Sequence, residues 1–128
     1  MTPRQVFEKL SAGISSDDWS ELHELYAPDA VVEMPFALPQ PVRLRGRDEV
    51  RRHFALNGQA GLSLQARAVR VHETADPEVV IAEFDYEGRA AGGRTFRVAN
   101  IQVLRVRDGL IVETRDYHHH AALAAVLS

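Results

Sequence analysis

The second half of the chain contains four consecutive segments of strand-like composition, and these restrict its possible folds more than any other feature. Each segment alternates polar with apolar residues or is rich in β-branched and aromatic ones. The segments run from Leu64 to Glu73, Val79 to Glu87, Thr95 to Arg107 and Leu110 to His118. Turn residues connect them, most clearly Asp108-Gly109, because both positions tolerate the positive φ of a two-residue hairpin. We therefore expect successive hairpins and an antiparallel sheet.

Helical patterns precede these strands. Thr2-Pro3-Arg4-Gln5 has the form of a capping box, and apolar residues follow it at helical spacing as far as Ile14, with Gly13 marking the end of the helix or a bend near it. We expect a second helix after Ser15-Ser16, with an apolar stripe of Trp19, Leu22, Leu25 and Tyr26. A short strand from Ala30 to Met34 and a third helix from Asp48 to Leu56 should follow. Helices followed by hairpins indicate an α+β fold, with the helices on one face of a curved sheet.

Length and composition bound the class of protein. At 128 residues the chain should form a single domain, residues 1–128. It has no cysteine, which excludes disulfides, thiolate metal sites and cysteine nucleophiles. The net charge of −3 argues against a nucleic-acid partner, and no apolar run is long enough for a membrane span. We expect a cytoplasmic protein with neither partner.

Several strands carry polar residues among apolar ones. Asn100 and Gln102 lie in the middle of their strand, and buried amides need hydrogen-bond partners, so they should line a polar pocket or join a side-chain network. Asp116 ends an otherwise apolar strand face, and His118 follows two residues later. Asp116 is therefore the leading candidate for a functional acid, with a salt-bridged surface aspartate as the alternative. His118 is a candidate for proton transfer or substrate contact.

A second group of acids allows two interpretations. Glu83, Asp85 and Glu87 alternate along one strand, whereas Phe84 and Tyr86 share its other face. The simpler interpretation places the acids in water and the apolar set against the helices. In the other, Asp85 and Asp116 share a pocket, where their repulsion raises the pKa of one so that it can act as an acid.

Two further features concern ligands. The loop after Met34, which contains Phe36, Leu38 and several prolines, is either a flap over an apolar site or an ordinary surface connection. The run from His118 to His120 is a poor metal motif because adjacent strand residues point to opposite faces, and further ligands would be needed. We therefore expect no metal and no cofactor.

Taken in order, short motifs along the chain resemble the SnoaL-like branch of the NTF2-like, or ketosteroid-isomerase-like, superfamily. The motifs are Tyr26–Glu33, Gly46–Val50, Gly93–Phe96, Val106–Val112 and Arg115–Tyr117. The resemblance implies a cone-shaped barrel, in which a curved, mainly antiparallel sheet wraps around N-terminal helices and encloses a deep pocket. It also implies a homodimer formed through the sheet. The superfamily includes isomerases, cyclases, hydrolases and non-catalytic binders, so the fold alone does not give the function.

The resemblance also suggests site residues. Ketosteroid isomerases carry their catalytic Asp where this chain has Met34. Limonene-epoxide-hydrolase-like enzymes share the two aspartates that correspond to Asp85 and Asp116, although Glu83 stands where they have arginine. The base of SnoaL-type polyketide cyclases corresponds to Asp116. Asp116 and Asp85 are therefore the expected catalytic pair, and the expected substrate contacts are Glu83, Asn100, His118, Met34 and Phe36.

Two functional hypotheses follow. In the first, the protein is a cofactor-independent enzyme, an isomerase, cyclase or hydrolase, that applies acid–base catalysis to a small apolar oxygenated metabolite. Asp116 would be its general base and Asp85 the partner acid. In the second, the same pocket serves a non-catalytic small-molecule-binding or dimeric assembly module, and the two acids take part in salt bridges.

Overall fold

The computed structural model describes residues 1–127, and its N-terminal helix begins as predicted. Helix α1 (Pro3–Ser15) starts with a capping box. The Gln5 backbone N–H donates to the Thr2 hydroxyl, and the Thr2 backbone N–H donates to the Gln5 side chain. Such a pair satisfies donors that the first helical turn leaves without partners. The helix buries one apolar face, made of Val6, Phe7, Leu10 and Ile14.

The predicted second helix is wrong. Only Leu22–Leu25 is helical there, as a single 3₁₀ turn (η1), and strand β1 (Tyr26–Met34) begins immediately after it. The i, i+3 spacing of Trp19, Leu22 and Leu25 also fits three residues per turn, so the stripe did not require an α-helix. Proline is tolerated at position 28 because the β1 ladder is irregular between Tyr26 and Val31.

The four predicted strands are confirmed. They are β3 (Ser63–Glu73), β4 (Val79–Arg89), β5 (Thr95–Arg107) and β6 (Leu110–His118), and each pairs antiparallel with the next. Asp108 and Gly109 both have positive φ, 52° and 77°, as the hairpin prediction requires.

A bulge in β6 changes which of its residues share a face. Arg107 pairs with Leu110 and Val106 with Ile111, but Arg105 pairs with Glu113, so Val112 is an extra residue in β6. Ile111 is therefore fully buried, although simple alternation places it opposite Thr114 and Asp116.

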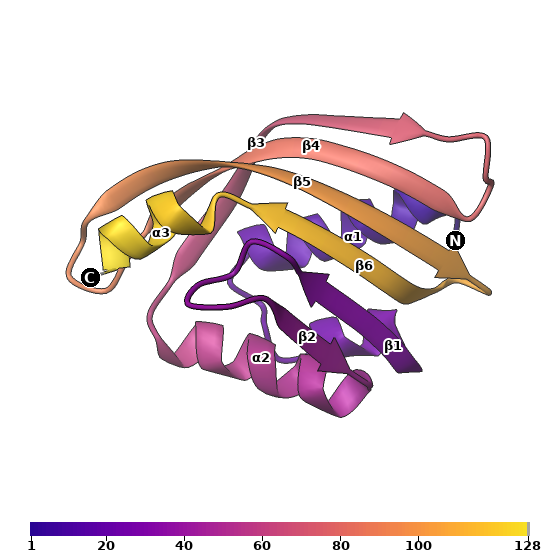
Figure 1. Cartoon of the computed structure of the whole chain (residues 1–128), viewed down its shortest axis with the longest axis horizontal. Helices are drawn as coiled ribbons and strands as arrows, with labels where there is room; N and C mark the ends of the chain where they lie inside the picture. Colours follow the sequence, from indigo (N-terminus) through magenta and orange to yellow (C-terminus); the bar gives the residue numbers. More distant parts are fainter. Residues whose placement is uncertain (128) are drawn as a thin grey trace.

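Three elements complete the fold, and two of them were not predicted. Helix α2 (Arg47–Gln59) contains the predicted third helix, whereas strand β2 (Val42–Arg45) and helix α3 (His120–Leu127) are new. Within residues 1–127 the sheet has six strands in the order β2-β1-β6-β5-β4-β3, and only β1 and β6 pair in parallel (Figure 1). The predicted α+β fold with a curved, mainly antiparallel sheet is thus confirmed, but the sheet does not close, because β2 and β3 are free edges.

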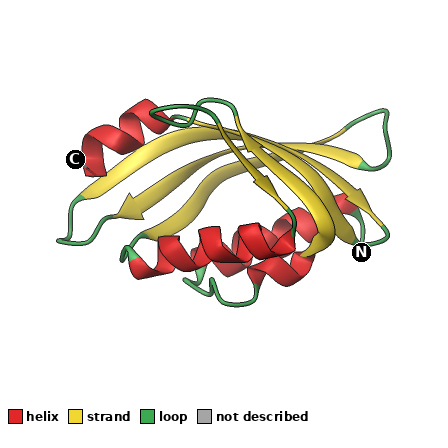
Figure 2. Ribbon diagram, turned by 60° about the horizontal axis from the view of Figure 1, so that its bottom comes forward, coloured by secondary structure: helices red, strands yellow, loops and turns green. Residues whose placement is uncertain are grey.

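The helices determine where a site can form. Figure 2 shows α1 and α2 together beneath the concave face of the sheet and α3 beside one of its ends. Inward-facing residues of β4 and β5, including Ala82, Phe84 and Leu104, join the apolar face of α1 in the core. No helix within residues 1–127 is long and apolar enough to cross a membrane.

Candidate functional site

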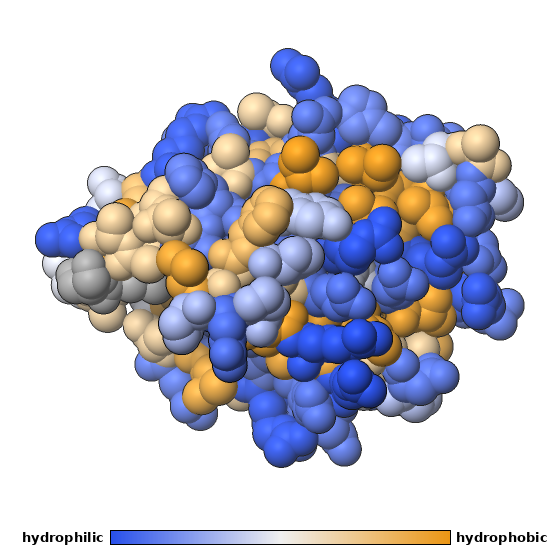
Figure 3. Space-filling model, in the orientation of Figure 1, coloured by the Kyte–Doolittle hydropathy of each residue, from blue (hydrophilic) through white to orange (hydrophobic). Residues whose placement is uncertain are grey.

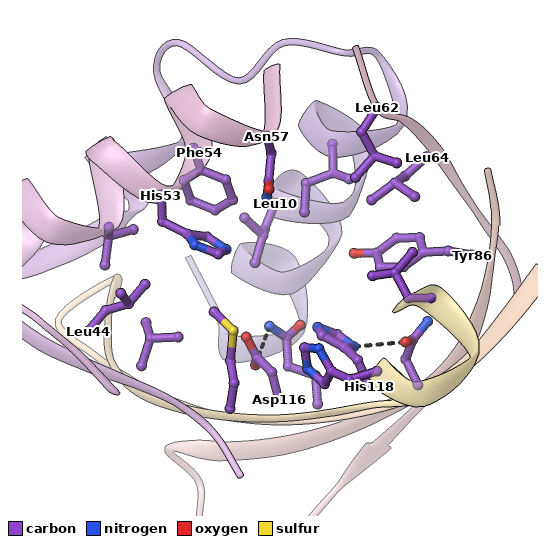
Figure 4. A pocket seen from close by; sticks show the side chains of 18 of the residues that line it. Leu10, Leu44, His53, Phe54, Asn57, Leu62, Leu64, Tyr86, Asp116 and His118 are labelled. Carbon is purple, nitrogen blue, oxygen red and sulfur yellow. Dashed lines mark hydrogen bonds between the residues drawn. The ribbon is translucent and has the colours of Figure 1, made fainter. Parts of the chain in front are cut away.

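A cavity of about 270 Å³ lies between the concave face of the sheet and the helices. Most of its wall is apolar, with Leu10 and Ile14 from α1, Phe54 from α2 and Leu123 from α3. A few polar side chains gather on the sheet side. His53 and Asn57 extend from α2 toward the sheet, where Asp116 and His118 face them (Figure 4). An apolar cavity with a few convergent polar groups is the usual form of a small-molecule site.

Asp116 is the central polar group of this cavity. Its residue is only 7% exposed, and its Oδ1 accepts a 2.8 Å hydrogen bond from Nε2 of Gln102 on the neighbouring strand. Burial raises the pKa of the carboxyl group to about 6, although the Gln102 bond and the nearby His53 and His120 act in the opposite direction. Asp116 is therefore mostly ionised at neutral pH, yet it can take up a proton within the physiological range.

His118 is held in one tautomer by Asn100, which is 4% exposed. The Asn100 Nδ2 donates to the Val98 carbonyl at 3.2 Å, so its Oδ1 is free to accept from the His118 Nδ1 at 2.8 Å. The His118 Nε2 is then left with a lone pair. Burial also lowers the pKa of His118 to about 4, so the ring is uncharged at neutral pH.

We expect nitrogen NMR of His118 at pH 7 to show a protonated Nδ1 and an unprotonated Nε2. The ring should titrate with a midpoint near 4, because burial disfavours the imidazolium. In Asn100→Leu the preference for the Nδ1–H tautomer should be lost. A protonated Nε2 in the wild-type protein, or a midpoint above 6, would contradict this assignment.

Further titratable groups complete the wall. Burial lowers the pKa of His53 and of His120, which keeps both rings mainly neutral at pH 7. Burial and the nearby Asp116 raise the pKa of Tyr26 and of Tyr86, so both hydroxyls keep their protons. The Tyr86 hydroxyl points into the cavity in Figure 4.

Four of the residues expected from the sequence meet in this cavity: Met34, Asn100, Asp116 and His118. Asp85 and Glu83 do not join them. Phe84 and Tyr86 of the same strand face the helices, so the alternating acids point to the opposite face of the sheet. There the Asp85 carboxylate lies 2.9 Å from Nε of Arg97, and the Glu83 carboxylate lies 2.6 Å from Nε2 of His72. The expected pairing of Asp85 with Asp116 in one pocket is therefore wrong, because the two carboxylates lie on opposite faces of the sheet.

Phe36 is also placed elsewhere. It is 61% exposed, and its ring centroid is 5.4 Å from that of Tyr117, whose strand neighbours Asp116 and His118 face the cavity. The loop that carries Phe36 therefore packs on the outer face of the sheet, and this favours the surface-connection interpretation over a flap.

Several lining residues were not among the expected site residues. His53 and Asn57 lie one helical turn apart on α2, and His120 starts a helix that was not predicted. Tyr26 had been assigned to the erroneous second helix. For His53 and Asn57 the i, i+4 spacing was an available signal, because it places two polar side chains on the same helix face.

Metal binding has little support in this arrangement. The rings of His118 and His120 are 5.7 Å apart and both line the cavity. Within residues 1–127, however, no three His, Asp or Glu side chains gather as metal ligands would.

The comparison with known families agrees with this architecture. The model of the SnoaL-like domain matches residues 7–114. The chain belongs to the SnoaL-like family. A PhzA/B-like protein of Pseudomonas aeruginosa is 36% identical over 110 residues, which cover 80% of this chain and 77% of that protein.

Solved structures show the same fold. A Bacillus subtilis protein described as a candidate isomerase has a TM-score of 0.88 and 28% identity, covering 96% of this chain and 90% of its own. A candidate polyketide cyclase from Xanthomonas campestris has a TM-score of 0.82 at 20% identity, covering 98% of this chain and 96% of its own. These likenesses confirm the place of the SnoaL-like chain in the NTF2-like superfamily.

Proposed function

We propose that this SnoaL-like protein is a cofactor-independent enzyme that uses Asp116 as a general base on a small, largely apolar, oxygenated metabolite. The observation that carries the proposal is the carboxylate of Asp116, a residue only 7% exposed, which faces the cavity, where burial raises its pKa to about 6. A base whose pKa lies near the working pH is well suited to proton transfer. The candidate isomerase from Bacillus subtilis, at 28% identity, supports this class of reaction.

In the proposed reaction Asp116, Tyr86 and Gln102 have different roles. Asp116 takes a proton from a carbon beside a carbonyl group, and the negative charge moves to the carbonyl oxygen. Tyr86, whose raised pKa keeps its hydroxyl protonated, donates a hydrogen bond to that oxygen. The protonated Asp116 then returns its proton to another carbon of the substrate, which completes an isomerisation. If the carbanion first attacks a second carbonyl carbon, the proton goes instead to the alkoxide oxygen formed there, which completes a ring closure. Gln102 positions the carboxyl group throughout.

Hydrogen–deuterium exchange tests this proposal without knowledge of the natural substrate. Cyclohexanone and 2-decalone are incubated with the protein in D₂O, and loss of their α-protons is followed by NMR. We expect exchange that accelerates as the pH rises through about 6, the pKa of Asp116. Asp116→Asn should slow it on the order of 10²- to 10⁴-fold.

Asp85→Asn is the matched control, because the same change on the other face of the sheet should leave exchange unaltered. Equal rates in Asp116→Asn and wild type would disprove the role of Asp116. Binding of the ketones without any exchange would favour the alternative function, a non-catalytic small-molecule-binding module.

We further propose that the protein forms a homodimer through the outer face of its sheet. Ile101 is 43% exposed there, and Phe36 and Tyr117 are near it in the same shallow depression. Figure 3 shows apolar side chains gathered over this part of the molecule, interrupted by hydrophilic ones. The neighbouring charges are balanced within the chain, as in the Arg97–Asp85 and Arg67–Glu87 pairs. Such a surface can meet a second copy of itself without charge repulsion.

Sedimentation velocity at micromolar concentration should therefore show a dimer. Ile101→Arg should convert it to a monomer, because a charge would be buried in the interface. Leu56→Arg is the control, since Leu56 is 64% exposed on α2, away from this face. A monomeric wild-type protein would contradict the proposal.

A further inference from the structure

The charges around the cavity are strongly one-sided. Asp116 is the sole acidic side chain among the described residues of the wall, and no lysine or arginine is among them. The histidines do not compensate for this charge, because burial lowers the pKa of His53, His118 and His120. At neutral pH the cavity thus holds a single negative charge whose direct partner is the neutral amide of Gln102.

This charge determines which ligands can enter. Two like charges repel strongly in a buried site, where the effective dielectric constant is low. A carboxylate or phosphate would also have to leave water without gaining a cationic partner, which is unfavourable. An uncharged ligand avoids both costs, and a cation gains a partner for Asp116.

The hydrogen-bonding groups on the sheet side point to the same conclusion. Asp116 offers carboxylate oxygens and His118 offers the lone pair of Nε2, because Asn100 occupies its Nδ1. Both are acceptors, so a polar group of the ligand that reaches them has to be a donor, whereas the Tyr86 hydroxyl on β4 remains the donor for an acceptor such as a carbonyl oxygen.

The rest of the wall suits an apolar body. Trp19 and Tyr26 each lie 6.0 Å from the ring of Phe54, measured between centroids, and all three line the cavity. Aromatic faces accept both hydrocarbon and cationic groups. A cavity of about 150 Å³ holds benzene, so one of about 270 Å³ has room for a larger ring system.

We propose that the cavity selects by charge: its ligand is an apolar, ring-sized molecule with a hydrogen-bond donor, a hydroxyl or ammonium group, and anionic molecules are rejected. This inference rests on the cavity being the substrate site proposed above. The substrate is therefore uncharged or cationic. Derivatives of the same carbon skeleton that carry a carboxylate, a phosphate or a thioester-linked nucleotide are excluded.

Three adamantane derivatives of the same size test the selection: 1-adamantanol, 1-adamantylamine and adamantane-1-carboxylate. Trp19 is the only tryptophan and lines the cavity, so its fluorescence reports binding directly. At pH 7.5 we expect the alcohol and the ammonium ion to bind. The carboxylate should bind at least about tenfold more weakly, because a repulsion of only about 1.4 kcal/mol between it and Asp116 lowers the affinity by that factor.

Variants then identify the origin of the selection. In Asp116→Asn the ammonium ion should lose about tenfold in affinity, the carboxylate should gain, and the alcohol should change little. Asp85→Asn should keep the wild-type order, because its carboxylate lies on the other face and is paired with Arg97. Retention of the wild-type order in Asp116→Asn would overturn the assignment of the selection to Asp116.

The affinity for the ammonium ion, whose own charge does not change, should also fall at pH 5. Asp116, with a pKa of about 6, is then mostly protonated. The groups that face it are His53 on α2, His118 and His120 at the end of β6 and start of α3, and Tyr26 and Tyr86 on the sheet. Any protonation of the imidazoles adds positive charge and acts in the same direction, whereas the tyrosines stay neutral.

Two results would overturn the inference. One is a carboxylate that binds as tightly as the alcohol at pH 7.5, and the other is failure of all three compounds to change the fluorescence of Trp19. Neither depends on catalysis. The protein can show the expected order of binding without catalysing deuterium exchange, and it can catalyse exchange without that order of binding, so failure of this inference and failure of the proposed function give different results.

Discussion

Asp116→Asn is expected to stabilise the folded protein at pH 8 by as much as about 3 kcal/mol. The pKa of Asp116 rises from its ordinary 3.8 to about 6 in the folded state, because burial disfavours the carboxylate. At about 1.4 kcal/mol for each pH unit, this rise corresponds to roughly 3 kcal/mol of instability once the group is ionised in both states. Asparagine keeps the Oδ1 that accepts from Gln102 and carries no charge, so it removes this cost.

The sign of the pH dependence follows from the same shift. Between pH 3.8 and 6 the folded state binds more protons at this site than the unfolded state, so stability falls as the pH rises through that window. Urea unfolding of wild type and Asp116→Asn should therefore differ most at pH 8 and converge near pH 4. Asp85→Asn should instead be slightly destabilising, by less than about 1 kcal/mol, because it breaks a half-exposed ion pair. A less stable Asp116→Asn at pH 8 would show that the carboxylate is stabilised in the fold.

Combined with loss of exchange activity, a gain in stability would separate function from folding. Replacement of a group that is required for folding should destabilise the protein. A group that is retained for catalysis is, by contrast, commonly unfavourable to the folded state, so its replacement can stabilise the protein. Asp116 satisfies the second description on its geometry: it is buried, it has no cationic partner among the described residues, and it faces a cavity.

Local patterns were sufficient to predict most of the fold. The turn residues and alternation of the second half gave the four hairpin strands, and the capping box gave the start of α1. They failed for residues 16–30 because the i, i+3 spacing of Trp19, Leu22 and Leu25 fits a 3₁₀ turn as well as an α-helix. In addition, the start of β1 at Tyr26 pairs with β6, about 80 residues later, and only its second half pairs with the nearby β2. Sequence separation of this kind leaves no local signal.

The pairing of the polar residues in the site depends on a single extra residue in β6, Val112. Continued from the Asp108-Gly109 turn without a bulge, the hairpin register would place Gln102 opposite Arg115. The extra Val112 shifts it by one, so that Gln102 pairs with Asp116 and Asn100 with His118. Both polar contacts of the cavity floor follow from that shift. Alternation identified Asn100, Gln102, Asp116 and His118 as candidates, but their pairing required the bulge, which short-range patterns did not reveal.

Phe7→Ala should have the largest destabilising effect of the changes considered, about 3–5 kcal/mol in the free energy of unfolding. Phe7 is 2% exposed, and its ring centroid lies 5.8 Å from that of Phe84 on β4. The removed ring leaves a cavity between α1 and the sheet, because neighbouring side chains can relax only in part. Phe36→Ala removes the same atoms from a residue that is 61% exposed, and it should change the stability by less than about 1 kcal/mol.

The same variant tests how α1 supports the site. Phe84 also packs edge-on against Tyr86, with ring centroids 5.0 Å apart, so the three rings connect the N-terminal helix to the wall of the cavity. Loss of Phe7 should therefore loosen Tyr86 and weaken the hydrogen bond that it donates to a developing oxyanion. In Phe7→Ala, assayed well below its unfolding midpoint, ketone exchange should slow while the pH midpoint near 6 set by Asp116 is retained. An unchanged rate in a destabilised but folded Phe7→Ala would show that Tyr86 is positioned without α1.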